Sequence, residues 1–302
     1  MLRAIDRFRD EFTQRGHEIT TPNVTQTLSE AELLTLVPQF DGWIIGDDPA
    51  NRRVFTAAKA GSLKAAVKWG VGVDNVDFAA CKDLDIPISN TPGMFGREVA
   101  DIAIGYVVAL ARETFSIDRG VKAGTWPKPP GMSLCEKNVA LVGFGDIGRN
   151  TAKRLVACEM NVTTYDPFFA VTPGLEAVKS ATWPLKVEDA DFVVLTCALT
   201  PETLHLVNAS SLALMKPGVR IVNVSRGPLI DERALAKCLE SGHVHSAALE
   251  VGEVEPIPDN SVLRQFGDRV LFGSHNASNT VEAVNRTSLK AIDLIDGFLR
   301  AA

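Results

Sequence analysis

Three polar side chains that could act together lie at or shortly after the ends of strand-like apolar runs in the second half of the sequence. Arg226 comes after the run at 219–224, His275 comes after the run at 270–272, and Glu255 lies between them. A guanidinium binds a carboxylate through two parallel hydrogen bonds, and an imidazole gives or takes a proton near neutral pH. A carboxylate beside the imidazole stabilises the protonated ring and fixes its orientation. Such a set suits proton transfer that accompanies hydride transfer on a carboxylate-bearing substrate.

Each of these residues also has a simpler interpretation when it is taken alone. An arginine at a strand end is commonly a salt-bridge residue, and a glutamate before a proline is commonly a solvated loop residue. His275 could mark the entry to the last helix, which begins near Asn279. His205 and His243 are weaker candidates for the same chemistry.

The stretch Asn138–Asn150, NVALVGFGDIGRN, joins a buried strand to a helix through a glycine-rich turn. In its G-x-G-x-x-G motif, Gly143 permits the tight turn, Gly145 lets a pyrophosphate approach, and Gly148 lets the helix pack on the strand. Backbone N–H groups and the helix dipole favour a phosphate there. The stretch therefore predicts a dinucleotide site, against the simpler interpretation of an ordinary strand-to-helix turn.

Asp166 distinguishes between the two nicotinamide cofactors. It follows Gly148 by 18 residues, at the end of a second strand-like run at 161–165. A carboxylate at this position accepts a hydrogen bond from a ribose 2′-OH and repels a 2′-phosphate. We therefore expect NAD rather than NADP.

The composition excludes several other classes of protein. The chain has 302 residues, of which 46% are hydrophobic and 23% charged, and its net charge is −6. It has no long basic run and no apolar run of about 20 residues, so neither nucleic acid nor a membrane is an expected partner. The 5 cysteines are scattered without a C-x-x-C pair. This spacing disfavours zinc and disulfides and fits a cytoplasmic protein.

Alternating strands and helices predict an α/β protein with two doubly wound domains. A Rossmann domain is expected over residues 96–277, and a smaller substrate domain over 1–95 plus 278–302. Six strands are expected in the Rossmann domain, at 138–143, 161–165, 192–196, 219–224, 245–249 and 270–272. In the smaller domain we expect strands at 18–20, 42–45, 64–67 and 86–88. Because ligands bind at the carboxyl ends of the strands in such sheets, the glycine turn, the three polar side chains and Glu250 should share one rim.

The sequence resembles the D-isomer-specific 2-hydroxyacid dehydrogenase family, and within it the phosphoglycerate-dehydrogenase-like branch. The likeness spans roughly residues 63–283. It rests on Gly70-Val-Gly-Val-Asp-Asn-Val-Asp77, Asn90-Thr-Pro-Gly93 with Val99-Ala100, Gly124-Thr-Trp126, Gly143–Gly148, Asn223–Gly227 with Asp231-Glu232, Glu255-Pro256 and Ser274-His275. The resemblance implies a Rossmann domain inserted in a flavodoxin-like substrate domain.

The resemblance also implies a role for each candidate residue. Arg226 would anchor and polarise a 2-oxo acid, Glu255 would support the catalytic His275, and Val71 and Gly72 would offer backbone donors to the substrate carboxylate. Besides Gly143, Gly145 and Gly148, the implied cofactor contacts are Asp146, Ile147, Asp166, Ala198, Leu199, Thr203, Val224, Ser225, Arg226, Glu250, His275 and Ala277.

The chain departs from the family pattern in four places. Glu250 stands where Asp is usual, Asp101 stands where Glu is usual, and Asn276–Asn279 replaces a glycine-rich turn. The fourth departure is that no strand precedes the first helix, so either the sequence is truncated or the small domain is rearranged. A sheet without its central strand leaves backbone groups unpaired. We therefore expect a gap, a shifted pairing or poor order around 19–20 and 42–45.

The resemblance implies an NAD-dependent oxidoreductase that interconverts a D-2-hydroxy acid and its 2-oxo acid. The substrate could be 3-phosphoglycerate, with Lys68, Arg52 and Arg53 around the phosphate, or a small acid such as glyoxylate or hydroxypyruvate; the simpler interpretation of these three cations is solvated surface charge. One alternative function is that of a catalytically impaired, NAD-sensing binding protein on the same fold. A second alternative is formate-type oxidation, against which Glu255 argues. We also expect a homodimer through the helix at 97–112 and the region of Trp126.

Overall fold

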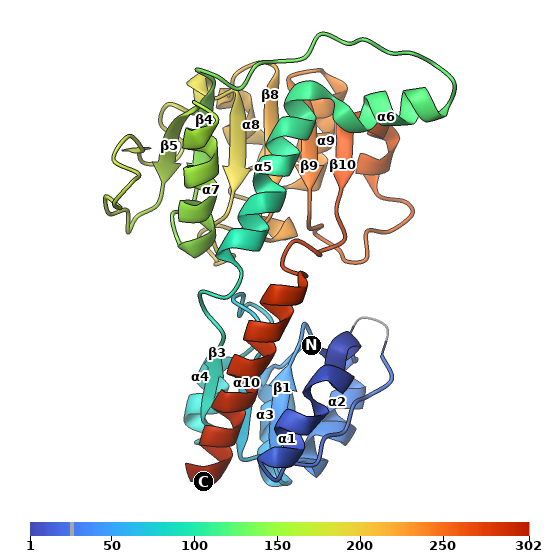
Figure 1. Ribbon diagram of the computed structural model, residues 1–302, viewed down its shortest axis with the longest axis vertical. Helices are drawn as coiled ribbons and strands as arrows, with labels where there is room; N and C mark the ends of the chain where they lie inside the picture. The colour runs from blue at the N-terminus through green and yellow to red at the C-terminus, as the bar shows by residue number, and fades with distance from the viewer. Residues whose placement is uncertain (25–26, 302) are drawn as a thin grey trace. The chain divides into compact units, whose positions relative to one another are not determined.

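The computed structural model describes residues 1–24 and 27–301. The chain divides into two compact units, which are described separately below (Figure 1). The small unit consists of Met1–Phe95 and Asn279–Ala302, and the large unit consists of Gly96–Ser278. Both are α/β units with parallel sheets, as the alternation of strands and helices predicts.

The large unit is built on a seven-stranded parallel sheet in the order β10-β9-β8-β7-β4-β5-β6. Its strands are β4 (Asn138–Val142), β5 (Asn161–Tyr165), β6 (Lys179–Ser180), β7 (Phe192–Leu195), β8 (Val219–Asn223), β9 (Val244–Leu249) and β10 (Val270–Phe272). Six of these strands were expected from the sequence. The expectation missed β6 because this edge strand has only two residues, both exposed and neither apolar.

Helices cover both faces of the large sheet, so its central strands are buried on both sides. Helices α5 (Gly96–Arg112) and α7 (Asp146–Ala157) lie side by side on one face, and α8 (Ala209–Leu214) and α9 (Glu232–Glu240) lie on the other (Figure 1). All four residues of β7 and all five of β8 are buried. The remaining elements are α6 (Thr114–Lys122), η3 (Val187–Asp189), η4 (Gly227–Leu229) and η5 (Val262–Arg269).

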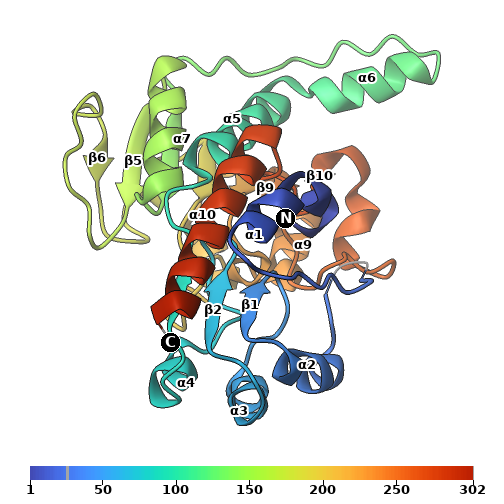
Figure 2. The same cartoon turned by 60° about the horizontal axis from the view of Figure 1, so that its bottom comes forward.

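The small unit has a three-stranded parallel sheet in the order β1-β2-β3. The strands are β1 (Gly42–Ile45), β2 (Ala65–Lys68) and β3 (Ile88–Asn90). Helices α2 (Glu30–Leu36), α3 (Arg52–Ala60) and α4 (Phe78–Asp83) supply the core on one face, where Phe55 is fully buried. The short η2 (Val37–Gln39) follows α2. Figure 2 shows α10 (Val281–Ala301) along the other face, which it shares with η1 (Leu2–Phe8) and α1 (Arg9–Gln14).

The small sheet corrects three expectations. The expected strand at 18–20 is wrong, since these residues pair with no strand of the described chain, whereas the expected gap around 19–20 is confirmed. The expected disturbance at 42–45 is wrong, since β1 pairs in regular register with β2, Gly42 opposite Ala65. The third strand begins after Pro87, at Ile88, rather than at 86. Pro87 has no N–H to donate, although its carbonyl still accepts from Ala66 at 3.0 Å.

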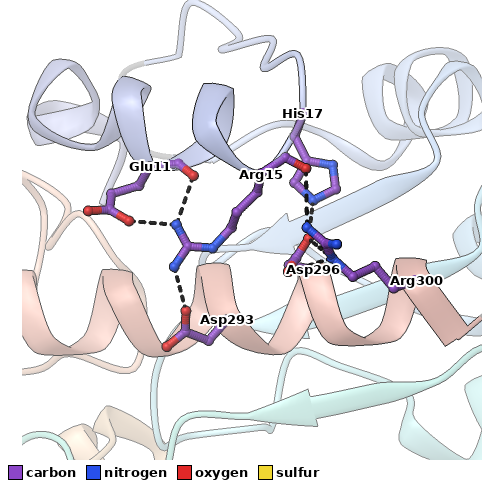
Figure 3. Close-up of polar contacts among 6 residues, drawn as sticks. All are labelled: Glu11, Arg15, His17, Asp293, Asp296 and Arg300. Atoms are coloured by element: carbon purple, nitrogen blue, oxygen red, sulfur yellow. Dashed lines mark hydrogen bonds and ion pairs between the residues drawn. The ribbon is translucent and has the colours of Figure 1, made fainter.

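Ion pairs connect the N-terminal helix to α10 (Figure 3). Arg15 donates to Glu11 at 2.5 Å on its own helix and to Asp293 at 2.8 Å on α10. The His17 ring lies 2.9 Å from Asp296, which Arg300 also contacts at 2.8 Å. Beneath these polar contacts, Phe8 and Phe12 pack against the apolar side of α10. Both ion pairs and apolar contacts therefore join the N-terminal segment to the last helix.

Candidate functional site

The glycine turn of the large unit has the geometry that a dinucleotide requires. Gly143 has φ +94°, and a Cβ there would lie 2.6 Å from the backbone N of Cys197. A Cβ on Gly148 would lie 2.2 Å from the carbonyl oxygen of Gly143, so this glycine lets α7 pack directly on the turn. A Cβ on Gly145, in contrast, would meet no atom within 4 Å. Two glycines thus shape the turn, and the third leaves open space in front of it.

The open space at Gly145 lies at the N-terminus of α7. Gly145 is the residue that precedes the helix, and no side chain caps it. The first N–H groups of a helix have no partner within the helix and carry partial positive charge, so they favour a phosphate. Asp146 and Ile147 begin the helix, and Asn150 donates to the Asp146 carbonyl at 2.9 Å. The residues present therefore fit the pyrophosphate of a dinucleotide.

Asp166 lies directly after β5 and faces this turn. One carboxylate oxygen accepts from the Phe144 N–H at 2.6 Å, and the other accepts from the Phe168 N–H at 2.8 Å. Each carboxylate oxygen has a second lone pair, so two ribose hydroxyls could still donate to it. The backbone bonds fix the side chain next to the glycine turn, where a 2′-phosphate would meet its negative charge.

A second group of polar contacts joins the ends of β7 and β8. Thr196 donates to the Gly143 carbonyl at 2.9 Å, and Ser225 donates to the Cys197 carbonyl. Asn223, fully buried at the end of β8, accepts from the Ser225 N–H at 3.0 Å and donates to the Arg226 carbonyl at 2.8 Å. These bonds hold the Ser225–Arg226 segment in one conformation beside the glycine turn.

Nearby, on the turn after β7, Thr203 donates to the Ala198 carbonyl at 2.8 Å and accepts from the Thr200 N–H at 2.7 Å, so it shapes the turn that holds Leu199. Val224 and Ala277 are buried. All of these predicted cofactor positions lie on segments that follow the carboxyl ends of the parallel strands.

His275 and Glu255, which the sequence predicts to act as a proton-transfer pair, contact each other in the large unit. The Nδ1 atom of His275 lies 2.7 Å from Glu255, and about 30% of each side chain is exposed. The second carboxylate oxygen of Glu255 accepts from the Gly252 N–H at 3.1 Å. The carboxylate therefore orients the ring through Nδ1. Arg226 lies at the end of β8, two strands from β10, which leads into His275.

Glu250, an expected cofactor contact, is bound within the protein. Its side chain is 4% exposed, and its two carboxylate oxygens accept from the Tyr106 hydroxyl at 2.5 Å and from the Asn276 N–H at 2.5 Å. Sequence reasoning did not single out Tyr106 in this role, because on α5 it reads as one of several apolar positions. The one available signal was that Glu250 is longer than the Asp that is usual in the family, so its carboxylate can reach a different hydrogen-bond partner.

The predicted substrate-binding loop belongs to the small unit and follows β2. Asn90 donates to the Val71 carbonyl at 3.0 Å, and Thr91 both accepts from the Gly70 N–H at 2.8 Å and donates its own N–H to the Gly70 carbonyl at 3.1 Å. Gly70 has φ +140°, and the Val71 side chain is 38% exposed. Gly72 follows within the same turn. The start of the loop is thus anchored to Asn90 at the end of β3 and to Thr91, which follows it.

Within the described chain, no group of three or more His, Cys, Asp or Glu side chains is arranged to hold a metal ion. No helix over the same residues is both long enough and apolar enough to cross a lipid bilayer. The five cysteines are all free thiols. Burial raises the pKa of the Cys197 thiol, next to the glycine turn, to about 11, so it is protonated at neutral pH.

Comparison with known proteins agrees with this geometry. Residues 104–277 match the family model described as the D-isomer specific 2-hydroxyacid dehydrogenase, NAD binding domain. The chain is 35% identical to a hydroxypyruvate reductase of Thermotoga maritima, over 90% of this chain and 89% of the relative. It is 34% identical to a D-3-phosphoglycerate dehydrogenase of Methanocaldococcus jannaschii, over 94% of this chain but only 54% of that protein, so it spans about half of this relative. The solved structure of the TT0316 protein of Thermus thermophilus superposes with a TM-score of 0.88 at 30% identity, covering 99% of this chain and 94% of that chain.

The Rossmann sheet and the match to the NAD-binding-domain family model identify an NAD-dependent oxidoreductase. The chain belongs to the D-isomer specific 2-hydroxyacid dehydrogenase family, and its cofactor is NAD. The family likeness read from the sequence is confirmed, and the dehydrogenase interpretation is favoured over a non-catalytic NAD sensor.

Proposed function

We propose that this protein reduces a small 2-oxo acid to the corresponding D-2-hydroxy acid, and that His275 is the proton donor. The observation that carries the proposal is the 2.7 Å contact between His275 and Glu255, at the strand ends where a Rossmann sheet binds its ligands. NADH, when bound, supplies the hydride for the substrate carbon. Arg226 would bind the substrate carboxylate with its planar pair of donors.

The chain's own residues would control the proton. Glu255 stabilises the protonated ring of His275, so that the proton is present when the carbonyl oxygen of the substrate gains negative charge. In the oxidation direction the neutral ring would accept the proton of the hydroxyl group. The same pair therefore serves both directions and gives them opposite dependence on pH.

We assign the cofactor to the large unit through the positions named above, from Gly143–Gly148 to Ala277. The division at 1–95 plus 278–302 and 96–277 would separate a substrate domain from a cofactor domain. Val71 and Gly72 would supply backbone N–H groups to the substrate carboxylate. The anchored conformation of their loop supports this role, because preformed donors lose little entropy on binding.

The contacts made by three cationic side chains favour a small acid over a phosphorylated one as the substrate. Lys68 is 2% exposed, which corrects its interpretation as a surface charge; it donates to the Gly46 carbonyl and to Asp47 at 3.1 Å. Arg52 pairs with Asp83 at 2.7 Å, and Arg53 pairs with Glu30 at 2.9 Å. Each cation therefore already contacts an acidic side chain. A phosphate would have to compete with these carboxylates.

We further propose that the protein is a cytoplasmic homodimer. Apolar side chains of α6 and the segment that follows are exposed: Phe115 by 47%, Val121 by 43% and Trp126 by 75%. Grouped exposed apolar residues of this kind commonly mark protein interfaces. The five free thiols support a reducing compartment. Light scattering tests the dimer, and a monomeric mass at micromolar concentration would contradict it.

The decisive test of the substrate class is a panel of 2-oxo acids assayed with NADH and with NADPH in parallel. We expect turnover of hydroxypyruvate or glyoxylate, with a kcat/KM at least about 10-fold above that of the 3-phosphorylated analogue and about 10-fold higher with NADH than with NADPH, since each factor of ten corresponds to about 1.4 kcal/mol. A preference for the phosphorylated acid would overturn the small-acid proposal. NADH binding without turnover of any acid would overturn the enzymatic proposal.

A further inference from the structure

His275 has an unusual backbone, and Glu250 holds it in place. The φ of His275 is 54°, a left-handed conformation that residues other than glycine rarely adopt. The His275 N–H donates to the Glu250 carbonyl at 2.8 Å, and the next N–H, of Asn276, donates to the Glu250 side chain at 2.5 Å. One residue thus binds two successive N–H groups through its backbone and its side chain. A strained conformation persists only where the surrounding bonds fix it.

The other oxygen of the Glu250 carboxylate is bound by Tyr106 of α5, through a hydrogen bond of 2.5 Å. The pair needs the glycine at position 273, because a Cβ there would lie 2.0 Å from the Glu250 carboxylate and 2.7 Å from the Tyr106 hydroxyl. Burial raises the pKa of the Tyr106 hydroxyl above its ordinary value, and the bond to Glu250 raises it further. Tyr106 therefore keeps its proton and acts as the donor.

We propose that Tyr106 and Glu250 are positioning residues that set the orientation of His275 toward Glu255 and the substrate. The hydrogen bonds run without a break from α5 through Tyr106, the Glu250 carboxylate and the Asn276 N–H to the left-handed backbone of His275. Neither residue needs to touch the substrate for this role. The inference rests on the proposed reaction, in which His275 gives the proton.

Loss of the Tyr106 hydroxyl should lower turnover while leaving cofactor binding intact. Without its donor the buried carboxylate can rotate, and the His275 segment moves with it; misplacement by about 1 Å can cost a factor on the order of 10² in rate. For Tyr106→Phe we expect kcat to fall by about 5- to 50-fold, with the Kd of NADH changed less than about 2-fold. If Glu250 acted chiefly through the nicotinamide ring, as the family resemblance implies, the Kd of NADH would rise instead.

The pH profile supplies a readout that a general loss of stability would not change. Reduction needs the protonated ring of His275, so its rate falls as the pH rises. A weaker contact with Glu255 stabilises the protonated ring less, and the ring loses its proton at lower pH. The descending limb for Tyr106→Phe should therefore move to lower pH.

The chain contains a matched control, since its only other tyrosine is Tyr165. The Tyr165 hydroxyl also donates one hydrogen bond in the large unit, to the Leu185 carbonyl at 2.9 Å. Burial raises its pKa to about 12. Tyr165→Phe removes the same atom without touching the His275 segment. It should keep the kcat and the pH profile of the wild type.

A double-mutant cycle completes the test. Glu250→Asp shortens the side chain, so it cannot reach Tyr106 and Asn276 together and should lower kcat by at least as much as Tyr106→Phe. If the two residues act as one unit, the double variant should have a kcat within about 2-fold of that of Glu250→Asp alone. Multiplicative losses, or wild-type kcat and pH profile for Tyr106→Phe, would overturn the proposal. If His275→Ala is also fully active, the proposed reaction itself fails, which separates the two results.

Discussion

The two units of this chain stabilise parallel sheets in different ways. The large sheet has seven strands, and its central strands β7 and β8 are entirely buried between helices on both faces. The small sheet has three strands, and its first, β1, pairs on one side only within the described chain. Ion pairs between the N-terminal helix and α10 supplement the small unit's core. The large unit is thus stabilised by a wide sheet buried on both faces, whereas the small unit combines a narrower sheet and its core with ion pairs between its two ends.

The largest expected effect concerns the chemistry of the large unit. His275→Ala should lower kcat by a factor on the order of 10²–10⁴, the usual contribution of a general acid or base, while NADH still binds. The chain offers a control in a second histidine–glutamate pair, His205 with Glu253 at 2.6 Å. His205→Ala should stay within about 3-fold of wild type in kcat, since only the first pair is assigned to proton transfer. Equal losses of kcat for the two variants would contradict the assignment of proton transfer to His275 and Glu255.

The glycine turn separates stability from cofactor binding. Gly148→Ala places a Cβ 2.2 Å from a backbone oxygen and should destabilise the large unit by about 1–3 kcal/mol, as overpacking commonly does. Gly145→Ala meets no atom within 4 Å and should leave thermal stability unchanged. It should nevertheless raise the Kd of NADH by roughly 10- to 100-fold, because a methyl group displaces the pyrophosphate from charge-assisted hydrogen bonds. Unchanged NADH affinity in Gly145→Ala would place the pyrophosphate elsewhere.

Hydrogen exchange compares the two sheets directly. The Trp69 N–H donates to the Ile45 carbonyl at 2.9 Å, so the neighbouring residue Ile44 directs its own N–H to the outer edge of β1. We expect the Ile44 amide to exchange at least about 10-fold faster than that of Val193 in the buried β7, because an amide outside a ladder needs only local opening. Equal protection would mean that another segment covers this edge.

The smallest effect concerns the ion pairs on α10 (Figure 3). The hydrogen bond from Arg300, and next that from His17, lowers the pKa of Asp296. A lowered pKa stabilises the fold above the unfolded value of about 3.9, and this contribution is lost as the pH falls through the folded value. Asp296→Asn should therefore lower the Tm of the small unit at pH 7 by no more than about 2 °C. The difference should shrink when the Tm is measured at a pH below that unfolded value.

A matched control for this variant is Asp6, which pairs with Arg9 at 2.7 Å on the N-terminal helix without reaching α10. Asp6→Asn should not change the Tm at either pH. If both variants lower the Tm equally, the loss of a surface carboxylate explains the effect, and the contact between the N-terminal segment and α10 does not.

The sequence predicted the large unit well because its signals are local. Each signal spans only a few residues: an apolar run is followed directly by a glycine motif or by a polar residue. The position of Arg226 and His275 at strand ends can therefore be predicted from spacing alone. The contacts that hold these residues are not local. Tyr106 reaches Glu250 across 144 residues, and no periodicity in α5 distinguishes it from an ordinary apolar position.

The small unit was less predictable for a related reason. Lys68 reads as a surface charge, yet it lies in β2 with 2% exposure because the Gly46 carbonyl and Asp47 accept its ammonium group. Residues 18–20 have strand composition, but no strand of the described chain lies beside them to pair with. Strand formation depends on a partner that composition does not reveal.

The central claim is that this protein transfers hydride from NADH to a 2-oxo acid as a D-isomer specific enzyme. The most direct measurement incubates the purified protein with NADH and hydroxypyruvate and analyses the hydroxy acid on a chiral column against the NADH consumed. We predict one equivalent of the D-isomer for each NADH oxidised. The L-isomer, or NADH that remains unoxidised in the presence of every 2-oxo acid tested, would contradict the account.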